Sequence, residues 1–164
     1  MNGHRAPLVR AGTWIGIGMG GFVDGILFHQ ILQFHQMLST RLPRVTLVNV
    51  EVNMFWDGLF HAFTWMATAA GILLLWRATG DRRVPHSSRV LTGAVLLGWG
   101  LFNLVEGVID HQLLGLHHVV ESSRRPLFWD LAFLASGVVL IAVGWLLIAK
   151  PGLAGMPQAR PHAT

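Results

Sequence analysis

The stretch 103–118, NLVEGVIDHQLLGLHH, concentrates acids and imidazoles at the end of an apolar run. Its ionisable residues are Glu106, Asp110, His111, His117 and His118. At about 100° of rotation per residue, Asn103, Glu106, Asp110 and His117 would share one face of a helix. Neutral imidazole nitrogens and carboxylate oxygens together are typical of a divalent transition-metal site. Such groups are costly in a membrane, where a charged residue near the centre costs about 2.5–3.5 kcal/mol.

The same pattern occurs earlier in the chain. The segment DGILFHQIL (24–32) matches EGVIDHQLL (106–114), and His35 follows Asp24 at the spacing at which His117 follows Glu106. Phe-Trp-Asp occurs at 55–57 and again at 128–130. These matches predict two similar helical hairpins running in the same direction, related by a pseudo-two-fold axis along the membrane normal.

The repeat is imperfect. His61 corresponds to Leu134, and Asp110 corresponds to Phe28. We therefore expect a pseudo-symmetric site, with the extra groups Asp110 and His118 as the source of its asymmetry.

The composition is that of a membrane protein. Of 164 residues, 52% are hydrophobic and only 12% are charged, against about 25% charged in soluble domains. There is no cysteine, which excludes thiolate metal sites, iron–sulfur clusters and cysteine nucleophiles. The basic residues lie mainly in loops and form no aromatic-rich patch, so we expect no nucleic-acid partner.

Four apolar runs are long enough to cross a bilayer of lipid. We predict an all-α membrane protein, a four-transmembrane-helix bundle made of two parallel helical-hairpin repeats. The expected spans are about 14–32, 54–76, 90–113 and 127–148, within a domain of residues 13–148. Residues 1–12 would form a cytoplasmic N-terminus, and 149–164 a flexible cytoplasmic tail.

The distribution of basic residues predicts the orientation. Eight of the 12 lie at the two termini and in the middle loop. The positive-inside rule therefore places these segments on the cytoplasmic side of a bacterial inner membrane. The acids and histidines then collect in the outer halves of the spans, and the inner halves are almost free of them. This one-sided layer predicts a basin open to the extracytoplasmic face, not a transport path across the bilayer.

We expect this layer to bind one or two divalent transition-metal ions: Fe, Zn, Mn or Cu. The expected ligands are Asp24, His35, Asp57, His61, Glu106, Asp110, His111 and His117. Residues that would support these ligands or replace them are His29, Asn53, Asn103, His118 and Asp130. On a straight helix His29 points about 140° away from Asp24, whereas His35 points almost the same way. His29 and His35 can therefore face one point only if the helix bends or unwinds.

Three functions fit such a site. The first is a metal-dependent membrane enzyme, an oxidoreductase before a hydrolase, acting on a small-molecule or lipid substrate. The second is a non-enzymatic metal-binding or metalloenzyme-assembly protein. The third is a b-type cytochrome with His29 and His111 as axial ligands, which the many acids disfavour. A purely structural polar layer that holds the helices together is the remaining alternative.

The motifs DGILFHQILQFH, NMFWDGLFH and NLVEGVIDHQLLGLHHV together resemble a bacterial family of predicted membrane proteins, domain of unknown function 2243. The resemblance covers roughly residues 13–148. It implies an integral membrane protein and supplies no mechanism.

Overall fold

The computed structural model describes residues 3–149, and within this range every regular element is a helix. A short turn, η1 (Gly3–Arg5), leads into α1 (Ala6–Phe22), which continues as the π-helix η2 (Val23–Ile31). After α2 (Leu47–Gly80) the chain returns through α3 (Ser88–Glu106), which continues as a second π-helix, η3 (Gly107–Leu113). The last helix is α4 (Pro126–Ala149).

The helices extend beyond several of the expected spans. α1 begins at Ala6, inside the segment expected to precede the first span, and Pro7 occupies its first turn, where proline needs no hydrogen-bond partner. α2 begins at Leu47 because Thr46 caps it: the Thr46 hydroxyl accepts a hydrogen bond from the Asn49 amide at 3.2 Å. The expected flexible tail lies, apart from Ala149, outside the described residues.

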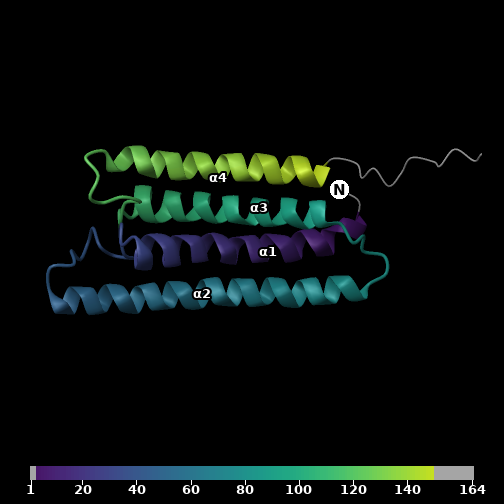
Figure 1. The fold of residues 1–164 in the computed structure, drawn as a ribbon, viewed down its shortest axis with the longest axis horizontal. Helices are drawn as coiled ribbons and strands as arrows, with labels where there is room; N and C mark the ends of the chain where they lie inside the picture. The colour runs from purple at the N-terminus through teal and green to yellow at the C-terminus, as the bar shows by residue number, and fades with distance from the viewer. Residues whose placement is uncertain (1–2, 150–164) are drawn as a thin grey trace, which may run out of the picture.

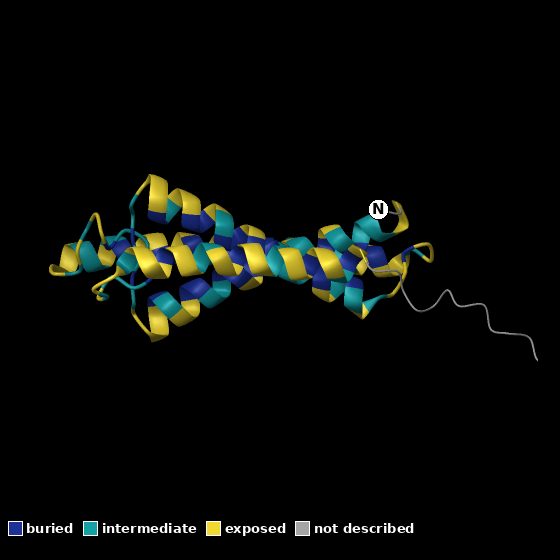
Figure 2. Ribbon diagram, turned by 90° about the horizontal axis from the view of Figure 1, so that it is seen from above, coloured by how far each residue is buried: buried dark blue, intermediate teal, exposed yellow. Residues whose placement is uncertain are grey.

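Four helical segments are long and apolar enough to cross a membrane. They lie in a row, with α1 and α3 in the centre and with α2 and α4 on the two flanks (Figure 1). α2 packs mainly on α1, and α4 packs on α3. The buried residues line the surfaces between helices, while the outward surfaces are exposed (Figure 2). The apolar outer faces of α2 and α4 are therefore the surfaces available to lipid.

Glycines allow the two central helices to approach closely. A Cβ atom added at Gly16 of α1 would collide with the carbonyl oxygen of Val95, and one at Gly98 of α3 would collide with that of Thr13. Small residues at such contacts permit the backbone approach that stabilises helix pairs in membranes. α1 and α3 run in the same direction, so the π-helices that follow them lie at the same end of the molecule (Figure 1).

Two loops, 32–46 and 114–125, bind each other at that end. The Thr40 amide donates to the Leu116 carbonyl at 3.0 Å. The hydroxyls of Ser39 and Thr40 donate to Glu121 Oε1 at 2.7 and 3.0 Å, and Arg41 donates to the Leu114 carbonyl. The loops thus form a joint cover over the ends of α1 and α3.

Candidate metal centre

The π-helices place each acid of the repeated motif beside a histidine of its own helix. In a π-helix the backbone hydrogen bonds join residues five apart. The side chains of residues i and i+5 therefore lie on nearly the same face of the helix. His29 is the fifth residue after Asp24, and its Nε2 lies 3.0 Å from Asp24 Oδ2. His111 stands in the same relation to Glu106, with Nε2 3.0 Å from Oε1. The unwinding that the sequence left open thus brings His29 to the Asp24 face.

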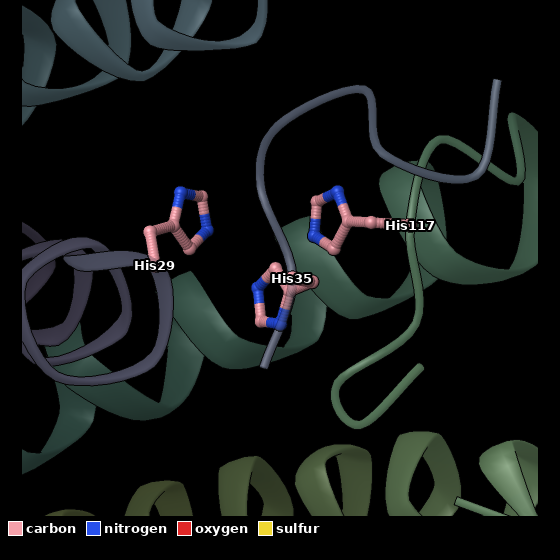
Figure 3. Close-up of side chains that lie close together, drawn as sticks. All are labelled: His29, His35 and His117. Atoms are coloured by element: carbon pink, nitrogen blue, oxygen red, sulfur yellow. The ribbon is translucent and has the colours of Figure 1, made fainter. Parts of the chain in front are cut away.

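A second pair of histidines comes from the two loops. Each π-helix is followed by one residue in the left-handed region, Gln33 (φ 51°) or Gly115 (φ 55°), which turns the chain back toward the bundle. The turn brings His35 and His117 together, with ring centroids 4.4 Å apart and planes inclined by 3°. Figure 3 shows these two rings on their loops beside His29 on the purple helix.

The Nδ1 atoms of three histidines are held by oriented hydrogen-bond acceptors. His29 Nδ1 lies 3.0 Å from Asp57 Oδ1. His35 Nδ1 donates to the Val119 carbonyl at 2.9 Å, and His117 Nδ1 donates to the Met37 carbonyl at 3.1 Å. A carbonyl can only accept, so Nδ1 of both loop histidines carries a proton. A metal would then bind at Nε2, which has no aligned partner in His35 and lies 3.0 Å from Glu106 Oε1 in His117.

The carboxylates that hold the rings are themselves fixed by the loops. Asp57 Oδ1 accepts the Met37 amide at 2.9 Å, and Asp130 Oδ1 accepts the Val119 amide at 2.9 Å. His118 Nδ1 lies 2.7 Å from Asp130 Oδ2. Asp130 is also near His111, but the distance of 3.7 Å from Oδ1 to Nδ1 exceeds that of a hydrogen bond.

The centre of the cluster holds buried polar atoms that have no aligned hydrogen-bond partner. These atoms are Asp24 Oδ1, His29 Nε2, His35 Nε2, Glu106 Oε2 and both ring nitrogens of His111. Their residues are at most 6% exposed, so solvent does not satisfy them. Unpaired buried groups are costly, and an ion at the centre would satisfy several at once.

Two overlapping groups have the composition and spacing of a metal site. In the first, His29, His35 and His117 each offer a nitrogen, and in the second, Glu106, His111 and His117 offer one oxygen and two nitrogens. Within each group the ligand atoms lie within 4.8 Å of one another. His117 belongs to both groups, so the two candidate ion positions are adjacent.

The two loop histidines differ electrostatically. Burial holds the pKa of His35 below its ordinary value of 6.5, and the neighbouring His117 and His29 rings add to this effect against the opposing Asp24. Burial also disfavours the charged form of His117, but the hydrogen bond to Glu106, at 3.0 Å, and the charge of Asp24 outweigh it and raise the pKa of His117. Protonation is therefore disfavoured at His35 and favoured at His117, although the two rings stack on each other.

Most of the expected ligands meet in this cluster. Asp24, His35, Glu106, His111 and His117 converge, and His29, expected only as an alternative, joins them. Asp57 and Asp130 lie behind histidine rings. Asn53 instead fixes the first loop through the Leu38 amide, at 2.9 Å, and Asn103 donates to the Ser136 hydroxyl on α4 at 3.0 Å.

Two expected ligands lie elsewhere. His61 lies against Gly25 and the Phe60 ring, and belongs to neither candidate group. Asp110 is half-buried and lines an apolar groove. The cluster is also closed by the loops, and does not line an open basin as expected, because the side chains of its six residues are almost fully buried.

The carbonyl acceptors at Met37 and Val119 could not be recognised from residue type, since every residue carries a carbonyl. Gln30, whose amide donates to Asp57 Oδ2 at 3.3 Å, does carry a signal: glutamine follows histidine in both motif copies.

Corresponding residues of the two motifs make corresponding contacts. The acid–histidine contacts in the π-helices, the left-handed residues and the loop carbonyl acceptors all occur in matched pairs. The wider interpretation, two parallel hairpin repeats, stays a prediction.

Fold and site together define an integral membrane protein with a buried histidine and carboxylate cluster at one end of its helices. The chain belongs to the family described as "Predicted membrane protein (DUF2243)", whose family model matches residues 11–151. This match confirms the resemblance seen in the sequence. Comparison with curated proteins and with solved structures gave no significant match.

Proposed function

We propose that this protein is a membrane metalloprotein that binds one or two divalent transition-metal ions, Fe, Zn, Mn or Cu, in the buried cluster. The observation that carries the proposal is the orientation of the imidazoles. Nδ1 of His29, His35 and His117 is hydrogen-bonded to an acceptor. Nε2 of each ring faces the other candidate ligands. Metal-binding histidines almost always show this arrangement, because the partner of the second nitrogen fixes the tautomer and the ring.

The number of bound ions depends on whether one or both of the candidate groups that share His117 bind an ion. One ion would take the three-histidine group, and a second would take Glu106 and His111, with His117 near both. Asp24 and Glu106 supply negative charge that offsets the charge of the ions. The absence of cysteine and the mixture of nitrogen and oxygen donors favour borderline and hard metals over soft ones.

We further propose a metal-dependent membrane enzyme, an oxidoreductase ahead of a hydrolase. Hydrolysis requires a water molecule on the metal and a route for polar substrate, whereas the cluster is covered by two loops that hydrogen-bond to each other. Redox chemistry with a lipid-soluble substrate requires neither. The second candidate, a non-enzymatic metal-binding or assembly protein, is favoured by the complete burial of the ligand set.

The packing of the histidines disfavours a haem. His35 and His117 stack directly on each other, and His29 and His111 contact them edge-on with centroids 4.5 and 4.8 Å away. A haem with two axial histidines needs its macrocycle between the two rings. The four imidazoles fill that space themselves.

The test is the metal content and absorption spectrum of the full-length protein, purified in mild detergent without chelators. We expect one to two ions per chain by elemental analysis. Charge-transfer bands would indicate iron or copper, and a colourless zinc protein would favour the hydrolase. Less than one ion per chain, persisting after reconstitution with each of the four metals, would contradict the proposal. Assays with lipid and redox substrates then separate enzyme from binding protein.

A further inference from the structure

An apolar groove runs from the lipid-facing side of the molecule to the cluster. It has a volume of about 520 Å³ and is formed by α1, α2, α3 and η3, within the usual range of ligand sites, about 300–1,000 Å³. Four aromatic side chains line it: Trp14, Phe60, Phe63 and Phe102. Val105 and Ile109 on its wall are 56% and 42% exposed, so the groove is accessible from the hydrocarbon of the bilayer.

The groove has one polar end, formed by Glu106 and Asp110. Glu106 belongs to both sites: its Oε1 lies 3.0 Å from His111 and from His117. Its Oε2 is buried and has no hydrogen-bond partner in the protein. Solvent does not supply one either, because the residue is only 6% exposed. An unpaired acceptor in a residue that lines a ligand-sized apolar groove can accept a hydrogen bond from a ligand bound there.

The other half of the molecule differs at the position that corresponds to Asp110. Phe28 stands there, stacked on Phe34 with centroids 6.0 Å apart and lying 6.4 Å from the His35 ring. The aromatic pair covers that side of the cluster. The groove therefore lies on the side of the cluster where the second motif has Asp110 in place of the phenylalanine of the first motif.

We propose that the groove binds the ring of a membrane-dissolved quinol, with a ring hydroxyl donating one hydrogen bond at the polar end formed by Glu106 and Asp110 and the tail directed into the lipid. The aromatic lining fits a planar ring, because aromatic pairs gain energy beyond their buried area. Two carboxylates require a head group that donates hydrogen bonds and exclude an anionic one. The apolar remainder of the lining makes a permanently charged head costly to bury.

Binding is inferred from the lining of the groove, and only a functional link between the quinol and the cluster rests on the proposed metal function. The probe is decylubiquinol, titrated without oxygen into the full-length protein in phosphatidylcholine nanodiscs and followed by calorimetry against empty nanodiscs. We expect saturable binding near one molecule per chain. Its dimethyl ether, which has no donor, and 1-dodecanol, which has no ring, should each bind at least tenfold more weakly.

Two variants locate the site. Asp110→Phe introduces the residue that the first motif carries, and Val105→Trp fills the groove from its exposed wall; each should weaken decylubiquinol binding at least tenfold. Ile31→Phe adds a ring at a lipid-facing position, 67% exposed and outside the groove lining, and should change the affinity less than twofold. Circular dichroism verifies folding, and Val105→Trp decides the matter if Asp110→Phe misfolds.

Equal affinity for quinol and ether, for quinol and dodecanol, or for Val105→Trp and the parent protein would overturn the proposal. Metal content is measured on the same samples. Quinol binding without metal contradicts only the metal proposal, and metal without quinol binding contradicts only the groove proposal.

Discussion

His35 and His117 stack with their ring planes inclined by only 3°, although they come from different loops. Each donates its Nδ1 proton to a backbone carbonyl of the opposite loop, His35 to Val119 and His117 to Met37. Each loop therefore orients the histidine of the other.

Removal of a stacked histidine should abolish metal binding. We expect His35→Ala and His117→Ala each to lower metal occupancy at least tenfold, because each ring is a member of a candidate ligand group. The matched control is His61→Ala, which removes a histidine outside both groups. Elemental analysis after dialysis against a weak chelator measures the effect. Loss of metal in His61→Ala, with retention in His117→Ala, would contradict the assignment.

Replacement of Asp57 tests the role of the carboxylate behind His29. Asp57→Asn keeps the size of the side chain but removes the charge that holds His29 Nδ1 at 3.0 Å. Loss of such a partner typically lowers metal affinity 10–100-fold, which competition with a fluorescent chelator can measure. Asp81→Asn, in the exposed loop after α2, should leave the affinity unchanged.

Metal affinity should increase with pH. The raised pKa of His117 means that the metal must displace a proton from this ring at any pH below that pKa. Binding should therefore strengthen by up to about tenfold per pH unit as the pH rises through 6.5 toward the raised value, and the dependence should flatten above it. Calorimetric titrations in buffers of different ionisation enthalpy would detect the released proton. Affinity independent of pH, with no proton release, would show that His117 is not a ligand.

Gly16 should tolerate no side chain at the crossing of the central helices. Gly16→Ala places a methyl group against the carbonyl oxygen of Val95, and overpacking of this kind costs about 1–3 kcal/mol. Gly58→Ala is the control, because a Cβ there meets no atom within 4 Å, and alanine in a helix should be neutral or stabilising. Thermal unfolding in detergent should show a lower Tm for Gly16→Ala alone.

The bonds between the loops should control the rate of metal release. Glu121→Ala removes the acceptor of the Ser39 and Thr40 hydroxyls, and two such bonds contribute about 1–3 kcal/mol together. Release to excess chelator should accelerate about tenfold or more, while Arg124→Ala, in the same loop and exposed, should match the parent. An unchanged rate would mean that the metal leaves by another route.

The sequence was sufficient to predict the helices and the polar layer, because both follow from hydropathy and from the cost of ionisable groups in apolar surroundings. It predicted five converging residues among its eight expected ligands. It could not predict the pairing of Asp24 with His29, because a rotation of 100° per residue assumes an α-helix. π-Helices hold well under 1% of residues, and nothing in the composition of 23–31 marks one.

The loops were beyond prediction for a different reason. His35 lies beyond the expected first span, 14–32, and its direction was judged only for a straight helix; in the structure it reaches the cluster after a turn at Gln33. For His61 the sequence predicted the position on the helix but not the contacts of the side chain. Its spacing from Asp57 on α2 is as expected for one helical face, yet Asp57 contacts His29 while His61 lies beside Gly25. The spacing of residues on one helix does not determine which of them contact the side chains of a neighbouring helix.

The exchange of carbonyl acceptors between the two loops has a consequence for biosynthesis. When the ribosome has produced only the first two membrane helices, His35 has no Val119 to orient it, and His117 does not yet exist. A chain that ends after the first two helices therefore has neither of the exchanged contacts, and the joined loops form only once all four helices have been made.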